Sequence, residues 1–175
     1  PALAVDEHRT HVATLALDGV VRVYTSDGRL ALERALLSPG DAPLLRAAAP
    51  SGDSTFVATS LDGRIRIVPI VFSVRFRDGA REVAPELGQT LTLTLDPEGR
   101  PLGASTARLQ EDRAVAVAQL ADGSIAIVRR DVEKSFLSGE GTETITRSVL
   151  PPVAEPTALV VDRAERTIFA GTTDG

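Results

Sequence analysis

The chain has 175 residues, a net charge of −5, six aromatic side chains (five Phe and one Tyr), and no cysteine, methionine or tryptophan. Without cysteine there is no disulfide, no thiol nucleophile and no thiolate zinc site. The acidic balance and the scarce aromatic residues argue against a nucleic-acid footprint and against a stacking platform for bases or sugars. No stretch approaches the length of a membrane-spanning apolar helix.

Along the chain, Asp-Gly pairs follow segments in which apolar residues alternate with others. These segments are VATLAL, FVATSL, AVAQLA and IFAGTT. The pairs are Asp18-Gly19, Asp62-Gly63, Asp122-Gly123 and Asp174-Gly175. The first three continue as DGVVRV, DGRIRI and DGSIAI, so each reads as a hairpin with a type I′ turn between two strands. A further upstream match, ALAVD ending at Asp6 and ALVVD ending at Asp162, extends the repeat.

A third strand is expected after each hairpin, in the segments that start at Arg29, Arg81 and Thr142. With the upstream strand, each unit has four antiparallel strands, which is typical of a β-propeller blade. We therefore predict an all-β, β-propeller-like fold with about three and a half blades. We predict one domain over 1–175, with units near 1–40, 41–90, 91–153 and an incomplete 154–175. A β-sandwich is the alternative fold.

Two segments depart from the repeat. Residues 42–49 are rich in alanine and are compatible with a short helix confined by Pro43 and Pro50. An insertion over approximately 71–103 adds a strand at FSVRF from Phe72, a turn at Asp78-Gly79, and a type I turn in DPEGRP from Asp96.

The partial blade count predicts unclosed ends. Because a propeller closes its ring, we expect sheet edges at the two ends of this chain to be exposed or to pack on a second molecule. The chain opens on Pro1 without an initiator methionine, so we interpret it as a processed product or an excised part of a longer protein.

Besides the Asp-Gly units, three segments carry a resemblance to a known family: FSVRF followed by REVAPEL, then LTLDPEGRPL, and then VEKSFLSGE from Val132 to Glu140. They resemble the soluble WD-repeat-like insertion domain found in phosphate-type ABC transporter permease subunits of proteobacteria. The resemblance implies a domain that faces the periplasm, in a parent protein of the inner membrane. As partners it implies other transporter subunits or a solute-binding protein, and no cofactor is expected.

The residues that could form a site are each explained better by a structural role than by a binding role. His8 and His11, with Asp6 or Glu7, form a conceivable metal pair, but we expect them in a turn. We interpret the repeat aspartates as turn formers. The basic residues of alternating strands are interpreted as a solvated sheet face rather than an anion site; these are Arg64, Arg66, Arg75, Arg77, Arg129 and Arg130.

No catalytic, cofactor-binding or metal-binding residue is therefore assigned, and no enzymatic activity is expected. The sequence has no phosphate-binding Walker loop and no calcium-type run of aspartates. The leading hypothesis is an accessory interaction or regulatory module of an ABC permease for phosphate or a related anion. The alternatives are a free-standing WD-repeat-like scaffold and a fragment of a propeller enzyme, which would need metal-binding carboxylates and histidines or a cofactor.

Overall fold

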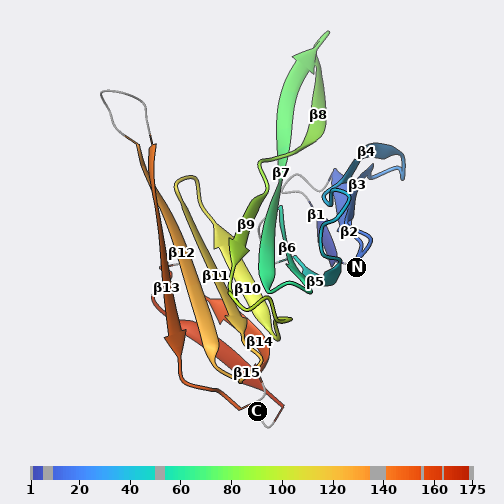
Figure 1. The fold of residues 1–175 in the computed structure, drawn as a ribbon. Coiled ribbons are helices and arrows are strands. Elements are labelled where there is room, and N and C mark those ends of the chain that lie inside the picture. The colour runs from blue at the N-terminus through green and yellow to red at the C-terminus, as the bar shows by residue number, and fades with distance from the viewer. Residues whose placement is uncertain are drawn as a thin grey trace. The chain divides into compact units, whose positions relative to one another are not determined.

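The computed structural model describes residues 2–5, 10–49, 54–134, 141–154, 156–162 and 164–173. In these ranges the backbone forms strands β1 to β15 joined by turns and loops, with no helix (Figure 1). The strands are grouped in four sheets, and the last of these has two strands. The all-β prediction is confirmed. None of the described residues lies in a helix long and apolar enough to span a membrane.

The first sheet is a meander in which each strand pairs with the next one in sequence. Its strands are β1 (Ala2–Val5), β2 (His11–Leu15), β3 (Val20–Thr25) and β4 (Leu30–Ala35). In β2 and β3 every second residue is buried, as the alternating sequence predicts. Leu15, Val21 and Val23 are fully buried, so one face of this sheet contributes to a hydrophobic core.

The first Asp-Gly pair forms a hairpin turn, but of another type than expected. Gly19 has φ of 78°, whereas Asp18 is not among the residues with positive φ. The Gly19 N–H donates to the Ala16 carbonyl at 3.0 Å, and the Ala16 N–H donates to the Val20 carbonyl at 3.2 Å. This is a type I turn followed by a bulge glycine, so the type I′ prediction is wrong here. Asp18 Oδ1 accepts a hydrogen bond from the Val20 N–H at 2.9 Å and fixes the turn.

The same turn design recurs in the second and third units. Gly63 and Gly123 have φ of 72° and 84°, and the Gly123 N–H donates to the Leu120 carbonyl at 3.0 Å. Asp122 Oδ1 accepts from the Ser124 N–H at 3.0 Å, as Asp18 does for Val20. The fourth pair, at 174–175, lies outside the described residues.

The turn glycines lead to a first prediction. A Cβ at Gly19 would lie 2.6 Å from Leu37 Cγ, whereas a Cβ at Gly28, with φ of 85°, meets nothing within 4 Å. We expect Gly28→Ala to cost about 1 kcal/mol of unfolding free energy, from backbone strain alone. Gly19→Ala should cost about 1 kcal/mol more, because Leu37 must move out of its packing. Urea denaturation of both variants measures the difference, and equal losses would contradict the role of Leu37.

The second sheet contains the longest strand of the chain. Its strands are β5 (Leu44–Ala48), β6 (Thr55–Ser60), β7 (Arg64–Arg77) and β8 (Ala80–Leu87), and β9 (Leu91–Thr94) also pairs with β7. Residues 42–49 do not form the short helix with which their sequence is compatible. Instead, β5 pairs antiparallel with β6 and Leu44 is buried. Pairing with a neighbouring strand overrides the helical propensity of alanine.

Strand β7 runs without interruption through the predicted insertion. The segment FSVRF is therefore the second half of β7 and not a strand of its own. Residues Ile70 to Arg77 pair with Leu87 to Ala80, and the connecting turn has φ of 51° at Asp78 and 79° at Gly79. Positive φ at both positions is the type I′ geometry, so the turn predicted at Asp78-Gly79 is present and is of this type. The type I turn at Asp96 is also confirmed, by a 3.1 Å hydrogen bond from the Gly99 N–H to the Asp96 carbonyl.

The third and fourth sheets follow the same strand order as the first. The third contains β10 (Ser105–Leu109), β11 (Arg113–Gln119), β12 (Ile125–Lys134) and β13 (Gly141–Leu150). The fourth contains β14 (Pro156–Val161) and β15 (Ile168–Thr172). β1 and β15 lie at the ends of their sheets, with Leu3 and Phe169 61% and 59% exposed. Their places in the strand order are compatible with the expected edges, and whether these edges pack on a second molecule stays a prediction.

The chain divides into two compact units, each with a core between sheets. The first unit comprises residues 1–61 and 66–92, and the second comprises 62–65 and 93–175. In the first unit, Val21 and Val23 of the first sheet share a core with Phe56 of the second sheet. In the second unit, Val117 and Ile127 share a core with Leu159 and Val161 of the fourth sheet. The single-domain assignment and the blade boundaries stay predictions.

Candidate functional site

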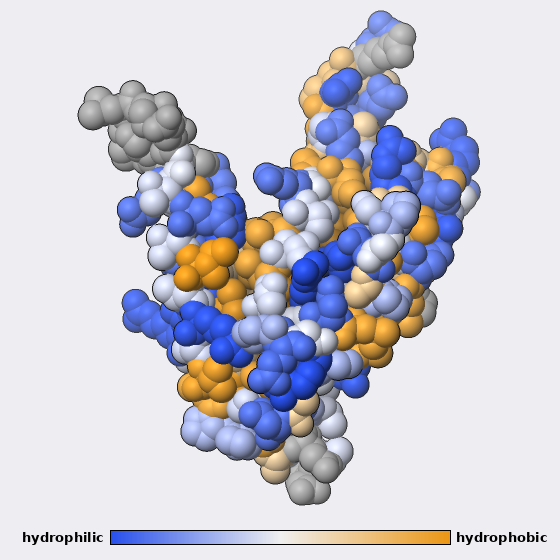
Figure 2. Space-filling model, viewed as in Figure 1, coloured by the Kyte–Doolittle hydropathy of each residue, from blue (hydrophilic) through white to orange (hydrophobic). Residues whose placement is uncertain are grey.

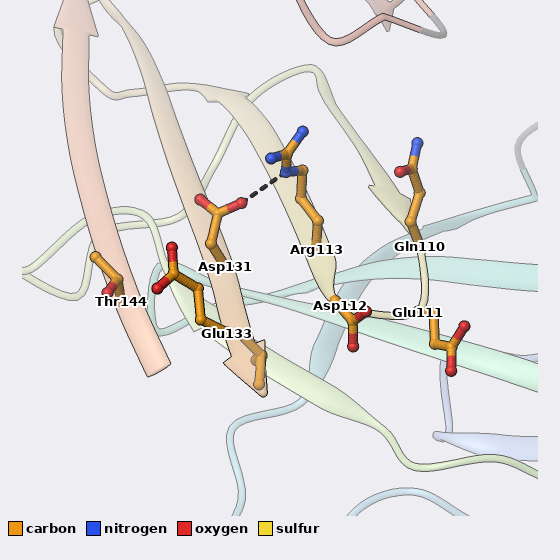
Figure 3. A pocket seen from close by; sticks show the side chains of 8 residues that line it. Gln110, Glu111, Asp112, Arg113, Asp131, Glu133 and Thr144 are labelled. Carbon is orange, nitrogen blue, oxygen red and sulfur yellow. Dashed lines mark hydrogen bonds and ion pairs between the residues drawn. The ribbon is translucent and has the colours of Figure 1, made fainter. Parts of the chain in front are cut away.

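A hollow of about 690 Å³ lies on the third sheet, in the second unit. It is lined by the β10–β11 turn, the start of β11, the second half of β12 and one residue of β13 (Figure 3). Its lining residues are Gln110, Glu111, Asp112, Arg113, Asp131, Val132, Glu133 and Thr144. The register of the sheet builds the hollow, because Asp131 is opposite Arg113 on one side and opposite Thr144 on the other.

The hollow has an acidic lining with one guanidinium group. Arg113 Nε donates to Asp131 Oδ1 at 2.6 Å, and this bond raises the pKa of Arg113 above its usual value. Glu111, Asp112 and Glu133 add three more carboxylates to the lining (Figure 3). The lining offers hydrogen-bond acceptors and a negative potential, which are features that suit a positively charged group. In the part of the chain that the structure describes, no three potential ligands are grouped to hold a metal ion.

Glu165 lies beside this hollow and is buried. It is 5% exposed, and its Oε2 is 3.8 Å from Arg113 Nη1. Its backbone has φ of 56° in the β14–β15 turn, where its carbonyl accepts from Arg129 Nη2 at 2.9 Å. Asp162 begins the turn and accepts hydrogen bonds from the Thr167 and Arg166 N–H groups, and these bonds lower the pKa of Asp162. Nothing in the sequence around Glu165 marks it as buried, since its surroundings depend on contacts with the third sheet.

The predicted turn aspartates are partly gathered in the second unit, around the ion pair of the buried Asp96 with the partly exposed Arg100. Asp96 is 1% exposed and accepts from Arg100 Nε at 2.7 Å. This bond lowers the pKa of Asp96. The charge of Asp122 also acts on Arg100, and the Gly63 carbonyl accepts from the Asp96 N–H at 3.1 Å. The aspartates therefore hold turns and loops together, in accordance with their structural interpretation.

The arginines do not form one solvated face. Arg66 is 5% exposed, and it donates to Ser60 Oγ at 3.2 Å and lies 3.6 Å from Asp41 Oδ2. The interpretation as a solvated residue is thus wrong for Arg66. The Asp41 carboxylate and the Ser60 hydroxyl offset the cost of burying its charge.

Arg64, Arg75 and Arg129 are exposed, in accordance with the interpretation as a solvated sheet face, whereas Arg130 is half-buried. Arg64 is 3.5 Å from Asp62, and Arg75 is opposite Glu82 in the β7–β8 pairing. The neighbours Arg129 and Arg130 contact different elements, as adjacent residues of a strand do. Arg129 reaches the Glu165 carbonyl, and Arg130 Nε is 3.1 Å from Glu143 Oε1. The side chain of Arg77 lies outside the described ones.

His11 is a core residue and not part of a turn. It is the first residue of β2, is 5% exposed, and its ring centroid is 5.5 Å from that of Phe72. Thr10 Oγ1 is 2.9 Å from His11 Nδ1. The turn placement is therefore wrong for His11, because the strand begins earlier than expected. His8, Asp6 and Glu7 lie outside the described residues.

A second surface feature, which sequence reasoning missed, is the outer half of the β7–β8 hairpin. We call residues 71–87 the outer hairpin. Its exposed apolar side chains are Val71 at 51%, Val74 at 40% and Phe76 at 76%. Hydrophobic residues are visible along this arm of the molecule (Figure 2). Val74 and Phe76 share one face of β7, and contiguous exposed apolar side chains of this kind often mark interaction surfaces.

No protein-family profile and no curated protein matches this chain. Among solved structures, it is similar to the β-propeller domain of Cps50 (Swd1) from Myceliophteria thermophila, with a TM-score of 0.50 and 14% identity. The match covers 99% of this chain and 49% of that one, so the chain spans about half its length. Weaker matches, with TM-scores of 0.31 and 0.32 and 10% identity, are U3-55K and the RRP9 WD40 repeats. Each weaker match covers 98% of this chain and 72% of the other. The four-stranded antiparallel sheets and the similarity to the Cps50 domain together show an all-β, β-propeller-like fold, with which a partial propeller is consistent.

Proposed function

We propose that this chain is a non-catalytic interaction module, the periplasmic domain of an inner-membrane ABC transporter permease for phosphate or a related anion. The observation that carries the proposal is the exposed apolar surface of the outer hairpin. Two of the segments that resemble the permease insertion domain, FSVRF and REVAPEL, form the strands of this hairpin. The resemblance and the exposed surface thus coincide in one element.

The outer hairpin has an apolar face that continues outward from the core. Phe72, Val74 and Phe76 lie on one side of β7, because they alternate along the strand. The register places Val83 opposite Val74 and Pro85 opposite Phe72, which extends the same face onto β8. Phe72 is half-buried against His11, whereas Phe76 is 76% exposed. An exposed aromatic side chain at the end of an apolar strip is a typical anchor for a protein partner.

The partner is a subunit of the transporter or its solute-binding protein, and titration calorimetry tests this directly. We expect the chain to bind the solute-binding protein, and Phe76→Ser to weaken binding about tenfold, which corresponds to the loss of one buried aromatic anchor. Phe169→Ser is the matched control, since Phe169 is 59% exposed on β15. It should leave the affinity unchanged.

The outcomes separate the candidate functions. Binding that is lost with Phe76→Ser and kept with Phe169→Ser supports the transporter module. Absence of binding to the solute-binding protein and to the other transporter subunits, with a folded chain, would contradict that role. A free-standing scaffold, the second candidate, shares the outer hairpin and would instead bind a protein unrelated to transport.

A further inference from the structure

Strand β13 is a long and exposed sheet edge. It stands at the end of the third sheet's strand order, and all ten of its residues, from Gly141 to Leu150, are exposed. Its pairing with β12 runs over the whole strand without a register shift. Alternate residues of an edge strand direct their N–H and C=O groups away from the sheet, so β13 can accept another strand.

The usual protections of an edge are absent within this strand. Residues 141–150 contain no proline, no bulge and no lysine, and the only charged residues are Glu143 and Arg147. Threonine, isoleucine and valine, which favour strands, occupy most of the remaining positions. The sequence of β13 therefore suits strand addition rather than an isolated edge.

We propose that β13 pairs antiparallel with β13 of a second copy of this chain, with Ile145 opposite the same residue of that copy. In a symmetric antiparallel pair, one residue must face its own counterpart across the two-fold axis. With Ile145 at the centre, Glu143 faces Arg147 of the second copy, and Arg147 faces its Glu143. The two charged residues of the strand then form two opposite-charge cross-strand pairs, which stabilise a sheet.

Neighbouring registers lack this complementarity. A centre at Thr144 places Glu143 opposite Ile145, and a centre at Thr146 places it opposite Val149. Charge complementarity thus selects both the second copy as occupant and one register. In that register the opposite face also matches, because Thr144 faces Thr146 and hydroxyl groups meet across the strands.

The side chains are positioned for this contact. Glu143, Ile145 and Arg147 share one face of β13, since they alternate along it. Ile145 is 56% exposed, and the Glu143 side chain is 48% exposed while it pairs with Arg130. Arg147 donates from Nε and Nη2 to the Leu95 carbonyl at 3.2 and 3.1 Å, which holds its side chain. The pairing is independent of any transporter partner.

Cysteine cross-linking of the full chain tests the register, because the chain has no cysteine of its own. We expect Ile145→Cys to form a disulfide-linked dimer on mild oxidation, since opposed Cβ atoms in such a pair are about 5 Å apart. Leu30→Cys, at a residue 53% exposed on the edge strand β4, is the matched control and should stay largely monomeric. Equal cross-linking of both variants, or none, would overturn the proposal.

Charge reversal tests the same contact without covalent chemistry. Sedimentation equilibrium should show that Glu143→Arg and Arg147→Glu each weaken self-association about tenfold, because each places like charges opposite each other twice. The double variant should regain dimerisation, although the contacts to Arg130 and Leu95 change. Circular dichroism verifies that the variants are folded. A wild-type chain that stays monomeric at high concentration, or a folded double variant that does not recover, contradicts the pairing.

Discussion

Replacing Phe56 with alanine is expected to lower the free energy of unfolding by about 3–5 kcal/mol, the range for removing a large side chain from a packed core. Phe56 is fully buried in β6 and belongs to the core between the first two sheets. The cavity left by the ring cannot close, because β6 is fixed by its pairing with β5. Chemical denaturation followed by circular dichroism measures the loss.

Phe76→Ala is the matched control for this prediction. Phe76 is 76% exposed, so the same substitution removes little buried surface and should cost less than about 0.5 kcal/mol. Comparable losses at Phe56 and Phe76 would show that the core does not lie between the first two sheets.

The second large effect is expected at Asp96. Its buried carboxylate accepts hydrogen bonds from Arg100 Nε at 2.7 Å and from the Glu98 N–H at 2.9 Å. Asp96→Asn keeps the shape but removes the charge, and should cost about 2 kcal/mol, the value for losing a hydrogen bond to a charged group. Glu98→Gln is the control, because Glu98 is 70% exposed at 3.0 Å from the same arginine. It should cost less than about 0.5 kcal/mol.

The Asp96 ion pair also makes stability depend on pH. The hydrogen bond from Arg100 lowers the pKa of Asp96 in the folded chain below its ordinary value of 3.8. The carboxylate of Asp96 therefore contributes to the free energy of unfolding above pH 3.8, and this contribution is lost as the pH falls through the pKa of the folded chain. We expect the free energy of unfolding, measured by denaturation between neutral and acidic pH, to change less with pH in Asp96→Asn than in the wild type. The same dependence of the unfolding free energy on pH in both proteins would contradict a charged, stabilising Asp96.

The strands and hairpins could be predicted from the sequence because they depend on local chemistry. Features that depend on non-local contacts could not. The Asp-Gly pairs at Gly19 and Gly123 predict hairpins because glycine is the residue that adopts positive φ without cost. The turn type was missed, since it depends on whether the preceding aspartate also has positive φ. The β5 strand was missed because its alanines favour a helix until β6 pairs with them.

The candidate site depends on register and burial, which the sequence does not specify. The alternation of Asp131 and Glu133 along one strand was a usable signal of a shared acidic face. That Arg113 lies opposite Asp131, however, follows only from the pairing of β11 with β12. The burial of Arg66 likewise depends on Asp41, which is distant in sequence. The exposure of Phe76 could not be predicted, because apolar alternation in a strand normally indicates a buried face.

The sequential order of strands within the sheets has a consequence for folding kinetics. In the first and third sheets each strand pairs with its immediate neighbour in the chain, so short loops close most of the ladder hydrogen bonds. Short loops cost little entropy to close, and proteins rich in local contacts fold faster than those with distant strand pairings. The first sheet, complete by Ala35, has its ladder partners in place while later residues are still being synthesised. Each sheet can thus form in the order of synthesis, which shortens the time during which unpaired strand edges are open to aggregation.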